Sequence, residues 1–196
     1  MKLISTLRIA LLSVLLSLTA GNAVAADKIA EYYQSYYNEL NDVYADSTAE
    51  TIYVFVHSLE KQSLRSLVLT GQDDIRRHAE WVIRLADALE PAAKSRSRSI
   101  VKAQEPLKVN LKYSVDGEWR EDSVMLKATL ESKKRQLVLH LGVDKIKDAD
   151  GKRRGGFRLS FTSASDTREF AEMLGKCYHA VPMRPMGATD SNIIIR

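Results

Sequence analysis

Residues 106–115, PLKVNLKYSV, alternate between apolar and polar side chains and are followed by Asp116-Gly117. Alternation with a period of two is typical of a β-strand that buries one face. Asp-Gly is a strong signal for a two-residue hairpin turn, because both central positions of a type I′ turn need a positive φ. The stretch therefore predicts the first strand of an antiparallel hairpin.

The Asp116-Gly117 turn also fixes the register of this hairpin. The polar residues of the first strand then face the second strand in three pairs: Lys112 opposite Glu121, Asn110 opposite Ser123, and Lys108 opposite Met125. Val109 faces Val124 in the same register, so the apolar residues of both strands share one face. The turn chemistry and the hydrophobic pattern agree independently, which supports the prediction.

Two further strands and a helix are predicted after this hairpin. The segments RQLVLHLGV (135–143) and GGFRLSF (155–161) continue the alternation, and a turn at Lys133-Lys134 sets Lys127 opposite His140. Ser165 or Asp166 can then cap a helix. One side of this helix carries Phe170, Met173, Leu174 and Cys177.

The first half of the chain shows mainly helical spacing. Residues 28–45 place apolar and tyrosine side chains three or four positions apart, which predicts a helix. Residues 47–70 are ambiguous, because Ser47 and Glu50 form a capping box whereas TIYVFV (51–56) is rich in strand-forming residues. We favour a buried helix there, since Ile52 to Val56 is apolar on both faces of a strand.

A clearer helix is predicted over residues 73–93. Asp73 and Asp74 provide negative charge in its first turn, where the helix dipole favours it. Pro91 and the run KSRSRS (94–99) are expected to end the helix and to link it to the strands.

These elements predict an α+β fold. It has N-terminal helices plus a four-stranded antiparallel meander with a C-terminal helix, and the helices cover one sheet face. We expect a single domain over residues 26–182, with a helical part (27–93) and a sheet and helix part (105–180). Residues 183–196 are interpreted as a flexible tail.

Residues 1–25 have the features of a cleaved signal peptide. Lys2 and Arg8 precede or border an apolar stretch that ends at Leu18, and Ala23-Val24-Ala25 is a small-x-small cleavage site. The apolar stretch is shorter than the roughly 20 residues that span a bilayer. Removing 25 of the 196 residues leaves 171. We expect a soluble, exported protein of the periplasm, with no transmembrane segment.

The charge and the cysteine content exclude some classes of protein. The chain has 29 Lys and Arg residues against 25 Asp and Glu, and loss of Lys2 and Arg8 leaves 27 against 25, a net charge of +2. A nearly neutral domain argues against nucleic-acid binding. Cys177 is the sole cysteine, so no intramolecular disulfide forms, and we interpret it as a buried apolar residue.

No catalytic or metal-binding motif is recognised. His57, His78, His140 and His179 fall on different predicted elements, and neither HExxH nor GxSxG is present. The run 148–151, DADG, has carboxylates like a calcium loop, but it lacks the bidentate Glu and is interpreted as a hairpin turn. We therefore predict no catalytic residue, no metal and no cofactor.

The outer, polar face of the predicted sheet is the candidate binding surface. By the register above it displays Lys108, Asn110, Lys112, Met125, Lys127, His140 and Arg158. The alternative is a solvated face whose lysines protect the sheet from aggregation.

The sequence favours an exported, non-catalytic protein that binds another macromolecule of the bacterial envelope, of the inhibitor, immunity or assembly-factor type. The alternative is a domain that binds a lipid or another small hydrophobic ligand in a pocket between the sheet and the helices. A hydrolase assembled from dispersed residues is a third, less favoured interpretation.

Overall fold

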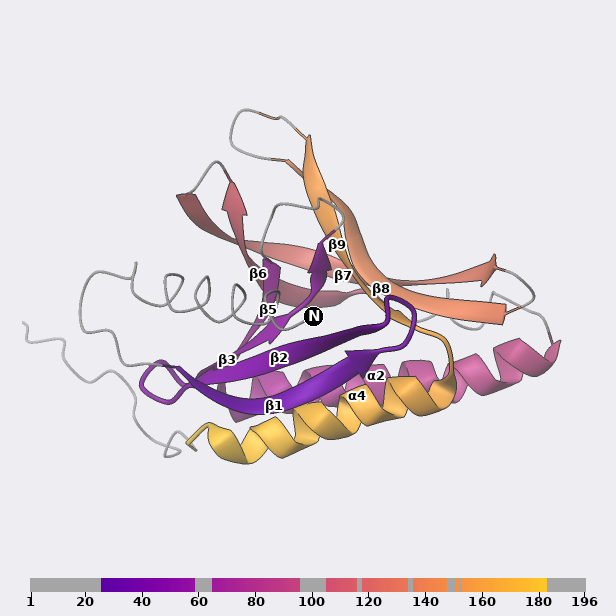
Figure 1. The fold of residues 1–196 in the computed structure, drawn as a ribbon, viewed down its shortest axis with the longest axis horizontal. Coiled ribbons are helices and arrows are strands. Elements are labelled where there is room, and N and C mark those ends of the chain that lie inside the picture. Colours follow the sequence, from indigo (N-terminus) through magenta and orange to yellow (C-terminus); the bar gives the residue numbers. More distant parts are fainter. Residues whose placement is uncertain are drawn as a thin grey trace, which may run out of the picture.

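The structure is a computed structural model in which residues 26–58, 65–95, 105–115, 118–133, 136–147, 151 and 153–182 are described. In chain order the elements are β1 (Asp27–Gln34), β2 (Glu39–Asp46), β3 (Thr51–Phe55), β4 (His57–Ser58), β5 (Arg65–Thr70), α2 (Gly71–Ser95), β6 (Leu107–Val115), β7 (Glu118–Lys133), β8 (Gln136–Lys147), β9 (Arg153–Phe161), α4 (Ala164–Cys177) and the 3-10 turn η1 (Tyr178–Ala180). Within these residues, nine antiparallel strands form one sheet in the order β1-β2-β3-β5-β6-β7-β8-β9-β4 (Figure 1).

The sheet curls so that β4, the last strand in its order, directly follows β3 in the chain, although β3 lies near the opposite end of the order. β3 pairs with β2 and β5, whereas β4, which follows after Val56, pairs with β9 through His57 opposite Arg158. The long strand β7 makes a similar change of partner, because residues 118–126 pair with β6 and residues 127–133 pair with β8. These two changes of partner bring β1 and β2 close to β9.

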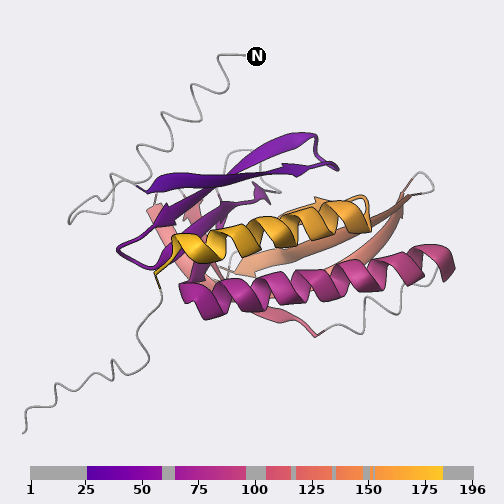
Figure 2. The same ribbon diagram turned by 90° about the horizontal axis from the view of Figure 1, so that it is seen from below.

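Helices α2 and α4 lie side by side on one face of the sheet, as the two views show (Figures 1 and 2). The apolar face of the sheet and the helices share one core. Its fully buried members include Ile52, Leu67, Leu111, Leu139 and Phe157 from strands, and Ile75, Leu85, Phe170 and Leu174 from helices. Burial of each such side chain contributes about 1.5–3 kcal/mol. The opposite face of the sheet is the one on which the candidate residues lie.

The predicted fold is wrong in its first half. The chain is mostly an antiparallel sheet, and only two helices longer than one turn occur in the described residues. The segment predicted as the helical part, residues 27–93, holds five strands before α2 begins. The four-stranded meander exists as β6 to β9, but as part of the larger sheet.

Residues 28–45 form the hairpin of β1 and β2 rather than a helix. Tyr32 and Gln34 are buried while Tyr33 between them is 54% exposed, which is a strand period. The turn over residues 35–38 includes Asn38 at φ +53°, a conformation that asparagine tolerates. Tyrosines in adjacent pairs suit both periods, so their spacing alone did not exclude a helix.

The described parts of segment 47–70, residues 47–58 and 65–70, form a turn and strands and not the favoured helix. The predicted capping box is instead a tight turn, in which the Asp46 carboxylate accepts hydrogen bonds from the backbone N–H groups of Thr48 and Ala49, both at 3.1 Å. Ile52 and Val54 face the core, and Tyr53 on the other face is half-buried. The strand is apolar on both faces because both faces are at least partly covered.

Helix α2 confirms the predicted helix and extends it in both directions. Gly71 begins α2 with φ +75°, which lets the chain turn sharply out of β5. Pro91 does not end the helix, which continues to Ser95. Helix α4 is also confirmed, but its N-cap is Ser163, whose hydroxyl accepts from the Asp166 N–H at 3.0 Å.

The second half follows the predicted strands closely. The register of β6 with β7 is confirmed from Leu107–Leu126 to Val115–Glu118. The next pair slips by two residues, because Lys133 pairs with Gln136 and Lys127 therefore lies opposite Gly142 rather than His140. A slip of two residues keeps every side chain on its predicted face. The predicted signal peptide (residues 1–25), the predicted tail (183–196), Asp116-Gly117 and residues 148–150 lie outside the described residues.

Candidate functional site

The outer face of β6 and β7 carries five of the seven predicted residues. Lys108 pairs with Met125, and Lys127 is two positions further along β7 on the same face. All three side chains are exposed, and Met125 is 47% exposed although it lies in mid-strand. We call Lys108, Met125 and Lys127 the sheet-face patch. It places a flexible thioether between two ammonium groups.

Lys112 and Asn110 are half-buried beside this patch. The Lys112 ammonium lies 5.4 Å from the ring centre of Tyr53 and 6.0 Å from that of Trp119. Glu121 lies opposite Lys112 in the strand register. Aromatic faces attract a cation, and a carboxylate opposite it compensates its charge. Lys112 is therefore engaged within the sheet, unlike the lysines of the patch.

His140 and Arg158 are separated from the patch by a covering segment. His140 is only 3% exposed, and the ring of Tyr36 meets its ring edge-on at 5.4 Å. Arg158 is half-buried and lies opposite His57 of β4. The predicted seven-residue surface is thus divided into an open part on β6 and β7 and a covered part on β8 and β9.

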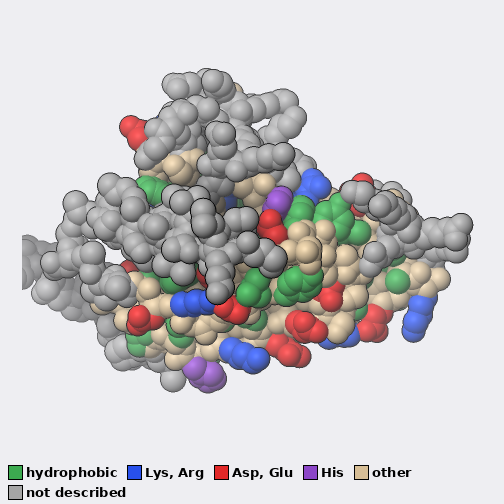
Figure 3. All heavy atoms as spheres, in the orientation of Figure 1, with side chains coloured by type: hydrophobic (Ala, Val, Ile, Leu, Met, Phe, Trp, Pro, Cys, Tyr) green, Lys and Arg blue, Asp and Glu red, His purple; other side chains and the backbone are tan. Residues whose placement is uncertain are grey.

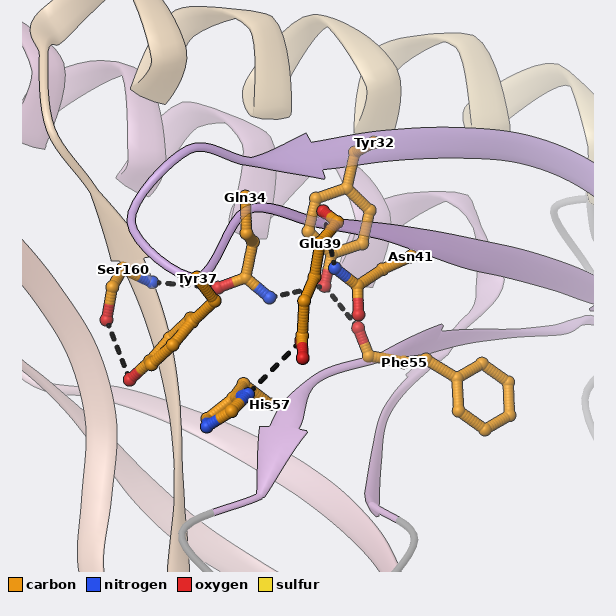
Figure 4. Close-up of polar contacts among 8 residues, drawn as sticks. All are labelled: Tyr32, Gln34, Tyr37, Glu39, Asn41, Phe55, His57 and Ser160. Carbon is orange, nitrogen blue, oxygen red and sulfur yellow. Dashed lines mark hydrogen bonds and ion pairs between the residues drawn. The ribbon is translucent and has the colours of Figure 1, made fainter. Parts of the chain in front are cut away.

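A network of polar side chains lies where the β1–β2 turn covers β8 and β9. We call it the hairpin cluster, and it comprises Gln34, Tyr36, Tyr37, Glu39, His57, Glu131, His140 and Ser160. Figure 4 shows how five of these side chains converge from β1, the β1–β2 turn, β2, β4 and β9. Gln34 and Ser160 are both fully buried, and the Gln34 side-chain carbonyl accepts the Ser160 backbone N–H at 3.0 Å. The Gln34 side chain thus binds the β9 backbone at Ser160, two residues beyond Arg158, where the pairing of β9 with β4 ends.

Tyr37 is the centre of the hairpin cluster. Its ring stacks on His57 with centres 3.6 Å apart and planes 11° from parallel, and the His57 Nδ1 lies 3.2 Å from a Glu39 carboxylate oxygen (Figure 4). The Tyr37 hydroxyl accepts a hydrogen bond from the Ser160 hydroxyl at 3.3 Å. Burial raises the pKa of Tyr37 above its ordinary value, which keeps this hydroxyl neutral.

Three members of the hairpin cluster have the residue types of a serine hydrolase relay. The Ser160 hydroxyl lies 2.7 Å from His140 Nδ1, and His140 Nε2 lies 3.1 Å from a Glu131 carboxylate oxygen. A nucleophilic serine must reach its substrate, however. Ser160 has no exposed surface, and its hydroxyl is already bonded to Tyr37. The arrangement holds the turn on the sheet, and it offers no access for a substrate.

The sequence shows the four histidines but does not indicate that two of them lie beside adjacent tyrosines of the β1–β2 turn. His57 and His140 belong to strands far apart in the chain, and only the return of β4 to β9 brings them near the same tyrosine pair. The signal that could have indicated a covered site was the polar pair His140 and Ser160 on strands otherwise rich in apolar residues. The alternation along these strands predicted that His140 and Ser160 lie on the outer face of the sheet, but not that the β1–β2 turn covers them.

The remaining candidate residues have structural surroundings. Cys177 is buried, its sulfur lies 3.6 Å from that of Met173, and burial raises its pKa to about 11. Among the described side chains, no group of three His, Cys, Asp or Glu residues is arranged to hold a metal ion. Neither helix in the described ranges has an apolar stretch long enough to cross a bilayer.

Figure 3 shows how side-chain types are distributed on one side of the molecule. Hydrophobic side chains gather near the turn end of the β1–β2 hairpin, while acidic and basic side chains are interspersed along the helices.

Comparisons of the chain with protein-family models, curated proteins and solved structures find no match.

Proposed function

We propose that the protein is an exported, non-catalytic binding protein whose sheet-face patch contacts another macromolecule of the cell envelope. The observation that carries the proposal is the exposure of Met125 between two exposed lysines. Isolated exposed apolar side chains are ordinary, but one in mid-strand with cations on both sides offers an apolar contact and a charged rim. Such a surface fits an acidic partner with an apolar side chain at the centre of its contact.

The other interpretations have less support. A hydrolase based on Ser160 would have to expose a side chain that the β1–β2 turn covers completely. A lipid-binding pocket between sheet and helices would have to open inside a core whose members are each at most 9% exposed. Export itself is supported by the sequence of residues 1–25.

A photo-crosslinking side chain in place of Met125 tests the patch in the native host. Ile83 on α2 is the matched position, since it is 43% exposed and lies on the helical side. We expect a discrete crosslinked product in the envelope fraction from position 125 and none from position 83. Equal products from both positions would contradict the proposal.

Charge reversal gives a second, independent test. K108E/K127E should abolish the product from position 125, because the ammonium groups then repel an acidic partner. R84E/K94E on α2 makes the same change of charge at exposed residues and should leave the product intact.

Export is tested separately. We expect a mature N-terminus at Ala26 and release of the protein by osmotic shock. An uncleaved cytoplasmic chain would overturn the exported part of the proposal.

A further inference from the structure

The edge of the sheet at β1 lies beside helix α4 with a groove between them. Among the described strands, β1 is the terminal strand of the sheet order and pairs only with β2, so its other edge faces the groove. The two elements run alongside one another in both ribbon views (Figures 1 and 2). The groove has a volume of about 410 Å³, within the range of ligand clefts.

The floor of this groove is apolar and its helical rim is acidic. Tyr32, Phe170 and Met173 are buried and form the floor, where the rings of Tyr32 and Phe170 meet edge-on at 4.9 Å. Glu169 and Glu172 of α4 are exposed on the rim. Neither of these two carboxylates has an ion-pair partner among the described residues. The rim thus offers negative charge that no ion pair within the described part of the chain neutralises.

The charge of the lining is opposite to that of the chain. Four carboxylates and one lysine line the groove, namely Glu31, Asp166, Glu169, Glu172 and Lys176, although the chain as a whole has a formal charge of +4. Glu31 is paired with Lys28, and Asp166 accepts hydrogen bonds from Ser35 and Thr162. The two remaining acids are therefore the ones available to a cationic ligand.

The free backbone edge of β1 favours a ligand that is an extended peptide. Alternate residues of an edge strand direct N–H and C=O groups away from the sheet, where an added strand can bond to them. The register shift between Lys28 and Ala30 interrupts the first part of β1 and leaves residues 30–34 as a regular edge. An extended segment of about five residues matches that length.

We propose that the groove between β1 and α4 binds an extended, basic peptide segment of another protein, which adds to β1 as a further strand. Alternate side chains of the peptide enter the apolar floor, and its lysines or arginines lie against Glu169 and Glu172. This surface is separate from the sheet-face patch, so either can fail without the other.

The test uses the full chain and a blocked hexapeptide of alternating lysine and valine as the probe. Backbone amide shifts in nuclear magnetic resonance spectra should change in residues 30–34 and 169–173 as the probe is added. A hexapeptide of alternating glutamate and valine should bind at least roughly five-fold more weakly, because exposed charge pairs each contribute modestly. A lysine and proline hexapeptide, which has fewer backbone donors, should not bind.

Two protein variants complete the test. E169Q/E172Q keeps the shape of the rim and should weaken binding of the lysine and valine probe about five-fold at low salt. E80Q/E121Q removes two exposed carboxylates elsewhere and should leave the affinity unchanged. Equal binding of the lysine and glutamate peptides, shifts confined to other strands, or a self-associated dimer through β1 would each overturn the proposal.

Discussion

The two parts of the sheet's outer face differ in what lies over them. On β8 and β9 the β1–β2 turn buries His140 and Ser160 to 3% and 0% exposure, whereas on β6 and β7 Met125 stays 47% exposed. Both parts carry polar side chains at alternate positions. In the covered part these side chains hold a distant hairpin in place, and in the open part they remain available to a partner. One face of the sheet is therefore closed by the hairpin in one part and left exposed in the other.

A substitution at Gly142, on the boundary between the two parts, should have the largest effect on the free energy of unfolding. Gly142 lies opposite Lys127 on one side and Arg158 on the other, and a Cβ atom there would approach the Phe157 carbonyl oxygen to 2.6 Å. Gly142→Ala should lower the free energy of unfolding by about 3 kcal/mol, since a backbone oxygen cannot move aside cheaply. Urea denaturation measures the change.

Gly175 provides the control for this prediction. It lies in α4, and a Cβ atom built there meets nothing within 4 Å. Gly175→Ala should therefore stabilise the protein by about 0.5–1 kcal/mol through helix propensity. A harmless Gly142→Ala would show that β8 and β9 are further apart than described.

Loss of the hairpin's buried amide gives the next largest effect. Gln34→Ala leaves the Ser160 backbone N–H buried without its acceptor, so the free energy of unfolding should fall by about 2 kcal/mol. Asn41→Ala, in the neighbouring strand and half-buried, is the control and should cost under about 1 kcal/mol. Equal costs for the two variants would mean that the turn does not depend on Gln34.

The tie between the hairpin turn and α4 gives a smaller, pH-dependent effect. Burial raises the pKa of Asp166, but hydrogen bonds from Ser35, Thr162 and Ser163 outweigh it and hold that pKa below its ordinary value. A lowered folded-state pKa stabilises the protein above the unfolded value, about 4, and this contribution is lost as the pH falls through the folded value.

Asp166→Asn should accordingly cost about 1 kcal/mol at pH 6 and progressively less below pH 4, as measured by denaturation at several pH values. Asp73, whose side chain is 94% exposed in its pair with Arg76, is the control. Asp73→Asn should change stability by under about 0.5 kcal/mol at every pH. A constant cost of Asp166→Asn across this range would contradict the assigned hydrogen bonds.

The open part should give the smallest effect on stability. Met125→Ser removes an exposed side chain that no hydrogen bond or core contact holds in the described structure, so the free energy of unfolding should change by less than about 0.5 kcal/mol. Thermal denaturation monitored by circular dichroism is sufficient to measure it. A cost above 1.5 kcal/mol would place Met125 in a structural role and weaken the proposed patch.

How far the sequence could predict this fold depended on local signals. The Asp116-Gly117 dipeptide defined the register of β6 and β7 correctly, because a two-residue turn leaves no freedom in pairing. The next turn has no such dipeptide, and the pairing of Lys127 was displaced by two residues. Helix α2 was recognisable because its apolar period is long and its first turn is acidic.

The first half was mispredicted for a different reason. Residues 51–56 look like a buried helix because both faces are apolar, but residues 51–55 form a strand between β2 and β5. Ile52 and Val54 face the core shared with the helices, and Tyr53 on the other face lies beside the Lys112 ammonium of β6. The same holds for the candidate site. Whether His140 or Met125 is exposed depends on where the residue 35–38 turn comes to lie, and no local pattern contains that position.

The pairing of β4 with β9 has a consequence for synthesis. His57 can find Arg158 only when nearly all of the described chain has been made, and contacts of such long sequence separation form slowly. Until then β4 has no partner strand, and the β1–β2 turn has no surface to cover. A chain cut short before β9 would leave an open edge and apolar strands that invite aggregation. The sheet can therefore close only in a chain that includes β9.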